Sequence, residues 1–225
     1  MARPRTHAPD ALLDAAEELL VGDGRAALTV RSLAARAGAS NGSIYHAFGS
    51  LETVVASAWL RRAEQFLEVQ RAVIASAGDA REAVRAAADA PAQLAERDLR
   101  AARLLVGLRH EDVLVDSVAA PVAERLRALE GDLTGTVREL ARRLAVPADL
   151  VTTCVVRLPS ALLFPEIRAG GVRPITRRRL AAAVGAVLDC TPTPQEEPEC
   201  PPSTAPATSS SSTSATRRTA STPTG

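Results

Sequence analysis

The sequence predicts an all-α fold, and three observations lead to that prediction. Apolar residues recur at helical spacings of three and four positions along most of the chain, and no stretch alternates with the period of two that marks a strand. Alanine, leucine and arginine, which all favour helices, are abundant. Hydrophobic residues make up 46% of the 225 positions and aromatic ones only 2%, so we expect an aliphatic core.

Two helices are expected in the first forty or so positions. The first begins near Asp10, a residue suited to capping, and stops at Gly22. Its apolar face consists of Leu12, Ala16, Leu19 and Leu20. The second begins after Thr29, a preferred N-cap residue, and ends at Gly38, which suits the left-handed conformation of a C-cap. Its apolar face consists of Val30, Leu33, Ala34 and Ala37.

A third short helix follows the second after a very tight turn. Ser40 is an N-cap type only three positions beyond the last apolar residue of the second helix. Ile44 and Phe48 then lie four positions apart on one face, and Gly49 ends the helix before Ser50 caps the next one. Two short helices joined by a glycine-bearing turn are typical of a helix-turn-helix.

The rest of the chain predicts a longer helical region and a polar tail. Helices are expected at 51–77, 80–89, 92–109, 117–145, 148–168 and 174–189. Pro91 is expected to separate two helices, Pro121 to mark a helix start and Pro159 to kink a helix. We therefore divide the sequence into a domain at 1–50, a domain at 51–190 and a tail at 191–225 that is rich in Ser, Thr and Pro and predicted to be disordered.

The distribution of charge and the cysteine content restrict the class of protein that the sequence can encode. The formal net charge is only +1, but no acid lies between Asp23 and Glu52, while three arginines and one histidine do. These residues are Arg25, Arg31, Arg36 and His46, and Arg3 and Arg5 precede them on an expected mobile arm at 1–8. Three cysteines without metal-ligand spacing, at 154, 190 and 200, argue against a secreted disulfide fold, and Cys154 is expected to be buried. The first residues lack the apolar segment of a secretory signal, and no apolar run approaches about 18 residues, so we expect a soluble cytoplasmic protein without a membrane partner.

The outer face of the third helix carries short polar groups and no carboxylate. Such groups suit an approach to phosphates and base edges, and Gly42 keeps the start of the helix slim enough for a major groove. The residues of this face are Ser40, Asn41, Ser43, Tyr45 and His46. The segment therefore predicts binding to double-stranded DNA.

This segment resembles the DNA-binding region of the TetR/AcrR family of transcriptional regulators. A dozen residues match that family's pattern in register over about 40 positions: Thr29, Leu33, Ala34, Ala37, Gly38, Ser40, Gly42, Ile44, Tyr45, Phe48, Ser50 and Glu52. The resemblance implies that Thr29 and Tyr45 contact phosphates and that Asn41, Ser43 and His46 contact bases, with Ser40 and Arg31 close by. It also implies a repressor that leaves a palindromic operator when a small-molecule effector binds.

Two positions depart from the family's pattern. Leu51 stands where the family usually has lysine, and Ala47 stands where histidine or tyrosine is common. Both positions lie near the DNA backbone in the family, and one fewer neutralised phosphate weakens nonspecific binding and its salt dependence. An alternative function is therefore a helical interaction protein of TetR-like fold that binds DNA weakly or not at all.

The helical C-terminal domain is expected to bind the effector and to form a homodimer. The resemblance implies a ligand pocket, for which we select five apolar residues and one polar anchor: Trp59, Phe66, Leu105, Leu108, Phe164 and Arg157. Dimer candidates lie on the last two helices: Leu158, Leu162, Leu163, Ala181, Val184 and Leu188. For every one of these residues, ordinary intramolecular core is the competing interpretation.

No pattern for catalysis, cofactor binding or metal binding is recognisable. The sequence has no Gly-x-Ser-x-Gly turn, phosphate-binding loop, dinucleotide glycine pattern or His-Glu-x-x-His. One histidine followed by two acids, His110 to Asp112, is a weak metal pattern. We therefore expect no catalytic residue, cofactor or metal, and an all-helical enzyme would need a cluster of reactive side chains that the sequence does not display.

Overall fold

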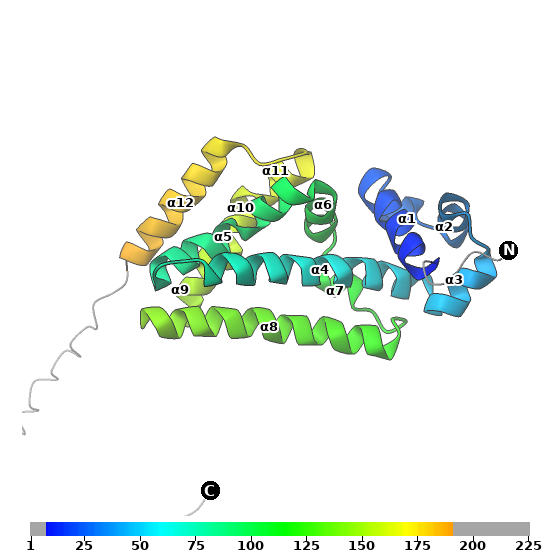
Figure 1. Ribbon diagram of the computed structural model, residues 1–225, viewed down its shortest axis with the longest axis horizontal. Helices are drawn as coiled ribbons and strands as arrows, with labels where there is room; N and C mark the ends of the chain where they lie inside the picture. Colours follow the sequence, from blue (N-terminus) through cyan, green and yellow to red (C-terminus); the bar gives the residue numbers. More distant parts are fainter. Residues whose placement is uncertain (1–7, 191–225) are drawn as a thin grey trace, which may run out of the picture. The chain divides into compact units, whose positions relative to one another are not determined.

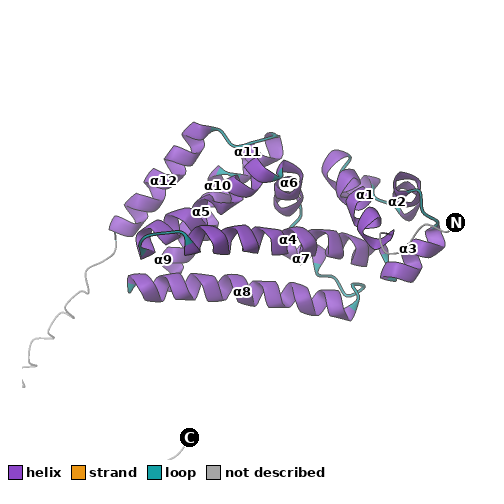
Figure 2. Ribbon diagram, viewed as in Figure 1, coloured by secondary structure: helices purple, strands orange, loops and turns teal. Residues whose placement is uncertain are grey.

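The computed structural model describes residues 8–190, and every regular element in that range is helical (Figures 1 and 2). The expected mobile arm with Arg3 and Arg5, Cys200 and the tail from 191 onward lie outside the described residues, apart from position 8, where the first helix begins. The described residues fall into one compact unit, so the division at position 50 is a functional one that the contacts do not mark.

Three short helices form the N-terminal part and pack on the start of the fourth. These are α1 (Ala8–Gly22), α2 (Val30–Ala37) and α3 (Asn41–Phe48), with a single 3₁₀ turn at Arg25–Ala27 that the sequence patterns did not predict. Leu12, Leu19, Leu33 and Ile44 meet in one buried cluster with Val54 of the next helix. The predicted apolar faces of all three helices therefore point into a common core.

The longer helices form the body of the described chain. Their bounds are α4 (Leu51–Ala75), α5 (Ala80–Arg97), α6 (Leu99–Gly107), α7 (His110–Val113), α8 (Ala120–Leu144), α9 (Ala148–Thr152), α10 (Leu158–Leu162), α11 (Phe164–Ala169) and α12 (Pro174–Asp189). Figure 1 shows α8 running alongside α4, and α5 and α6 lie against α4 as well. α12 packs on α5, so the body encloses a second aliphatic core.

The predicted break at Pro91 is wrong. α5 continues through this proline to Arg97, and the Pro91 ring is buried. A proline inside a helix costs one backbone hydrogen bond and a close contact with the preceding turn, but here the ring packs in the core among small alanine neighbours such as Ala88 and Ala92. The break lies at Asp98 instead, whose carboxylate accepts a hydrogen bond from the backbone N of Ala101 at 2.9 Å and so caps α6.

The other two prolines behave as the sequence predicts in broad terms. Pro121 lies in the first turn of α8, where its missing N–H costs nothing. Upstream of Pro159 the backbone widens into a π-helical turn at Thr153–Arg157, a known adjustment where an ordinary helical hydrogen bond is lost. Residues 148–169 thus form one nearly continuous helical stretch rather than a sharply broken one.

This stretch is more apolar than the sequence inspection suggested. Ala148–Ala169 is long enough to cross a membrane by length and composition, with a mean hydropathy of 1.4, whereas we expected no such run. Only a third of its apolar window is buried within the single chain. Cys154, on the covered side, is fully buried as predicted, and burial raises the pKa of its thiol.

The start of α12 is anchored to α11 by a single carboxylate. Glu166 accepts hydrogen bonds from the guanidinium of Arg173, from the backbone N of Arg173 at 2.8 Å and from the hydroxyl of Thr176 at 2.7 Å. These bonds, the Arg173 side chain foremost, lower the pKa of Glu166 to about 2. The carboxylate therefore remains charged at neutral and mildly acidic pH, next to the positive end of the α12 dipole.

Candidate nucleic-acid interface

Local hydrogen bonds fix where α2 begins. Thr29 Oγ1 accepts a bond from the backbone N of Ser32 at 3.0 Å, and the backbone N of Thr29 donates to Ser32 Oγ at 2.9 Å. This reciprocal capping box satisfies two backbone donors that a helix start leaves open. Thr29 remains exposed beside these open N–H groups, at the end of the helix where anions are favoured.

The turn between α2 and α3 is as short as the sequence predicts. Gly38 has φ of 62° in the left-handed region, which glycine adopts at little cost, and the next residue, Ala39, donates its N–H back to Ala34 O at 3.0 Å. Ser40 then caps α3 by accepting a bond from the backbone N of Ser43 at 3.1 Å. The two helices therefore meet in helix-turn-helix geometry, and α3 is the recognition helix of the motif.

The predicted base-reading residues divide into two groups. The hydroxyl of Ser43 donates to the carbonyl of Ser40 at 2.7 Å, and the Ser40 hydroxyl serves the cap, so both side chains are engaged locally. Asn41, Tyr45 and His46 are exposed, and none of their side chains has a hydrogen bond or ion pair with a residue that the structure describes. These three side chains are free to meet an external partner, and 53% of Tyr45 is exposed although it is a large aromatic residue.

Gly42 has no structural role inside the described chain. A Cβ atom at this position would lie 3.9 Å from Ser40 Oγ, an ordinary contact, and the backbone there is normally helical. Glycine in a helix costs up to about 1 kcal/mol relative to alanine. A side chain at position 42 would therefore meet no crowding within the described residues.

The positive charge of the interface is smaller than the sequence indicated. Arg36 forms an ion pair with Glu18 at 3.1 Å, and Arg25 lies 3.7 Å from Glu52, so acids from α1 and α4 neutralise both arginines. Arg31 is exposed and has no ion pair among the described residues. The acid-free stretch in the sequence is therefore not an acid-free surface in space, and Arg31 is its remaining fixed cation within residues 8–190.

The two positions that depart from the family pattern differ in burial. Leu51 is half-buried and packs against the core of the first three helices, while Ala47 is exposed on α3. Leu51 therefore stabilises the junction of α3 and α4 by packing, a role that lysine would fill only with its methylene stem.

A loop from the body also contacts the start of α4, and no sequence pattern indicated this contact. The hydroxyl of Ser50, the N-cap of α4, donates to the carbonyl of Ser117 at 3.0 Å. The backbone N of Ala119 donates to Thr53 Oγ1 at 3.0 Å. The segment between α7 and α8 is thereby held against the cap and first turn of α4.

The predicted apolar pocket residues pack on several connected clusters. Trp59, Phe66 and Leu105 are half-buried around a small cluster with Leu67 and Leu129. Phe66 and Leu105 also pack on the main core cluster together with Phe164, and Trp59 shares a further cluster with Leu108. The exposed guanidinium of Arg157 pairs with Asp149 at 2.9 Å and with Thr153 on its own helical stretch, and its role as an anchor stays a prediction.

Half of the predicted dimer residues are intramolecular core. Leu163, Val184 and Leu188 are at most 2% exposed within the single chain, so these three side chains belong to its own core. Leu158 and Leu162 are half-buried and Ala181 is exposed. The period of the helices identified apolar positions correctly but did not distinguish the inner face from the outer one.

The comparisons with known proteins agree with this geometry. Residues 12–58 match the family model described as bacterial regulatory proteins, tetR family. No curated protein matches the sequence significantly. Among the described residues, no group of three or more His, Cys, Asp or Glu side chains is placed to hold a metal ion.

Solved structures share the fold over most of their length. A transcriptional regulator from Rhodococcus sp. Rha1 is 20% identical with a TM-score of 0.66, covering 81% of this chain and 97% of its own. The TetR family transcriptional regulator PfmR from Thermus thermophilus is 20% identical with a TM-score of 0.59, covering 79% and 97%. The ketosteroid transcriptional regulator KstR2 of Mycobacterium tuberculosis is 16% identical with a TM-score of 0.59, covering 85% and 97%. Residues 12–58 therefore match the N-terminal domain of the TetR family of bacterial regulatory proteins, and the described helices as a whole take the fold of these solved regulators.

Proposed function

We propose that the protein is a cytoplasmic homodimeric repressor that binds a palindromic operator and is released from it by a small-molecule effector. The observation that carries the DNA-binding part is the exposed face of α3, where Asn41, Tyr45 and His46 have no partner among the described residues. Gly42, which nothing in the described chain crowds, lies on the same helix. Base edges and phosphates are the partners that such side chains recognise.

Two substitutions on α3 separate phosphate contact from base reading. Tyr45→Phe removes one hydroxyl that we assign to a phosphate, so we expect affinity to fall by a similar factor for every duplex. Asn41→Ala removes an amide that we assign to a base edge, so we expect a larger loss on the operator, of about 1–3 kcal/mol, than on scrambled DNA. Gel-shift titrations on an operator selected from random duplexes and on its scrambled form measure both effects.

The same titrations distinguish the alternative function. Two of the three nearby arginines are neutralised and Leu51 replaces a cation, which favours a helical interaction protein that has weakened or lost DNA binding. That alternative is supported if the wild-type protein selects no sequence and shows no salt-dependent binding. An equal loss of specificity in Tyr45→Phe and Asn41→Ala would contradict the roles assigned to these residues.

The homodimer is supported by the apolar stretch at Ala148–Ala169. A third of its apolar window is fully buried in the single chain, and several of its other apolar residues are only half-buried or are exposed. Leu158, Leu162 and Ala161 contribute half-buried or exposed side chains to it, and Ala181 lies exposed on α12, which packs on α10. A second copy related by two-fold symmetry is the proposed occupant, since a dimer also presents two recognition helices.

The effector site is proposed on one face of α4. Trp59, Phe66 and Gln70 follow each other at spacings of seven and four, so they share that face. Trp59 Nε1, Gln70 Oε1 and His110 Nε2 are buried atoms without a hydrogen-bond partner in the described structure, and the rings of Trp59 and His110 meet edge-on with centroids 5.7 Å apart. Buried polar atoms rarely stay unsatisfied, so an apolar molecule bearing hydroxyl or carbonyl groups fits this region.

Thermal-shift measurements with apolar alcohols, ketones and matched hydrocarbons test the effector proposal. We expect at least one oxygen-bearing compound to raise the melting temperature of the wild-type protein and to lower its affinity for the operator. The matched hydrocarbon should do less, because it leaves the buried polar atoms without partners. Insensitivity to every compound, in both melting and DNA binding, would contradict a sensor role.

A further inference from the structure

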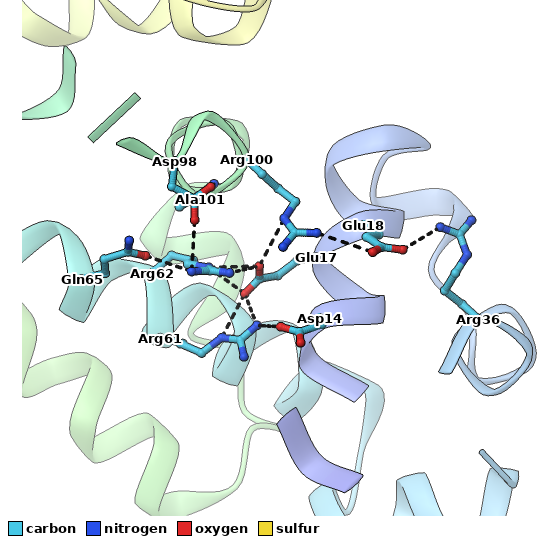
Figure 3. A network of polar contacts seen from close by, with 10 residues as sticks. All are labelled: Asp14, Glu17, Glu18, Arg36, Arg61, Arg62, Gln65, Asp98, Arg100 and Ala101. Carbon is cyan, nitrogen blue, oxygen red and sulfur yellow. Dashed lines mark hydrogen bonds and ion pairs between the residues drawn. The ribbon is translucent and has the colours of Figure 1, made fainter. Parts of the chain in front are cut away.

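One buried carboxylate joins three helices that belong to different functional parts. Glu17 of α1 has no exposed surface, yet it lies among arginines of α4 and α6 (Figure 3). Its Oε1 accepts bonds from Arg61 Nη2 at 2.6 Å and Arg62 Nε at 2.9 Å, and its Oε2 accepts a bond from Arg62 Nη2 at 2.6 Å. Arg100 Nε of α6 lies 4.0 Å from Oε2.

The arginine partners are themselves connected to α6. Arg62, whose side chain is only 14% exposed, places Nη1 3.4 Å from the carboxylate of Asp98, the residue that caps α6. Arg62 therefore contacts α1 through one edge of its guanidinium and the first turn of α6 through another. A planar guanidinium holds its partners in fixed directions, unlike an apolar contact, which permits sliding.

The connections continue to the helix-turn-helix itself. Arg100 Nη1 lies 3.5 Å from Glu18 of α1, and Glu18 also pairs with Arg36 of α2 at 3.1 Å. Figure 3 shows these side chains in a row from α6 across α1 to α2. An unbroken series of ion pairs thus runs from the body to the motif that contains the recognition helix.

Stability alone does not explain this arrangement. Replacing a buried ion pair by apolar residues of similar volume is often neutral or stabilising. A buried ion pair instead favours one arrangement of the helices, because any other arrangement leaves a charge without a partner in a low-dielectric environment. The apolar cluster of α1 already includes Leu104 of α6 and Val54 of α4. The added ion pairs therefore contribute direction to a contact that hydrophobic packing already makes favourable.

We propose that Glu17 is a positioning residue that sets the angle of the helix-turn-helix against α4 and α6, and thereby the half-site spacing that a dimer accepts. The inference rests on the proposed function, since spacing has meaning only for a dimer on an operator. Two recognition helices must enter grooves about one helical turn apart. A rotation of α1 on α4 would carry α2 and α3 with it, because α2 packs on α1 and α3 packs on α2.

The test compares dissociation constants on operators whose half-sites are moved apart or together by one and two base pairs. We expect the wild-type protein to prefer one spacing. In Glu17→Gln we expect the ratio between the best and the worst spacing to fall by about tenfold, a size typical of coupling between sites. Binding to a single isolated half-site should be unchanged, because the residues on α3 are intact.

Two further variants keep the result interpretable. Arg100→Gln removes the direct ion pairs between α6 and α1 and leaves the buried bonds between α1 and α4 and the Arg62–Asp98 pair. This variant should fold and show an intermediate loss of spacing preference, and it carries the test alone if Glu17→Gln does not fold. Glu64→Gln, which breaks the pair between α4 and Arg125 of α8, is the matched control and should keep the wild-type profile. An unchanged profile in the folded Glu17 and Arg100 variants overturns the positioning role, whereas failure of the wild-type protein to bind any operator overturns the proposed function instead.

Discussion

Replacing Ile44 by alanine is expected to lower the free energy of unfolding by about 2–5 kcal/mol, the usual cost of emptying a buried aliphatic site. Ile44 is 1% exposed and is the buried residue of α3, packed with Leu33 of α2 and the leucines of α1. The recognition helix has only eight residues and no other fully buried side chain. Ile44→Ala should therefore detach α3 from the core of the first helices, and operator binding should be lost even where the body of the protein remains helical.

Urea unfolding followed by circular dichroism, at one fixed protein concentration, measures this loss of stability. Ile44→Val removes a single methylene and should cost about 1 kcal/mol. Ala47→Ser lies on the exposed side of the same helix and should change stability by less than about 0.5 kcal/mol. If Ile44→Ala proves no more harmful than Ala47→Ser, the packing described for the motif is incorrect.

Introducing a charge at Ala161 is expected to dissociate the proposed dimer without unfolding the chain. Ala161 is exposed on α10, within the apolar stretch of which only a third is fully buried in the single chain. In Ala161→Glu, a two-fold interface would bury two carboxylates without partners, which costs several kcal/mol. Because a monomer loses the advantage of two linked half-sites, affinity for a palindromic operator should fall by about 100-fold or more.

Analytical ultracentrifugation and gel-shift titration check the two halves of this prediction. Ala128→Glu, on the exposed side of α8, adds the same charge away from α10 and should leave both the mass and the affinity unchanged. A variant Ala161→Glu that remains dimeric would place the interface elsewhere. A wild-type protein that is monomeric at micromolar concentration and still binds its palindrome tightly would contradict the dimer proposal as a whole.

The helix-turn-helix could be predicted almost to the residue because short-range rules determine it. Thr29, Ser40 and Ser50 are capping residues, and Gly38 and Gly49 supply positive φ values, so each helix end is encoded within three or four positions of itself. The same rules gave α12 its bounds at Pro174–Asp189. Local encoding of this kind does not depend on knowing how the chain packs.

The features that depend on packing could not be predicted in this way. Pro91 looks like a helix breaker until its ring is seen in the core, and Arg36 looks like a free cation until Glu18 is seen beside it. The hydrogen bonds of Glu17 join it to residues 44 and 45 positions away. A periodic pattern places Glu17 on the inner face of α1 but does not predict its charged partners. Which side of α10 faces inward could likewise not be predicted, because both of its sides carry apolar residues.

The contact between the segment before α8 and the start of α4 limits how this region of the gene can change. Connecting segments usually tolerate inserted or deleted residues, because nothing depends on their length. Here Ser117 and Ala119 hold Ser50 and Thr53, which are among the first residues after the recognition helix. An inserted or deleted residue between α7 and α8 is therefore expected to disturb the cap of α4, so the length of this connection should be as restricted in evolution as a helix cap.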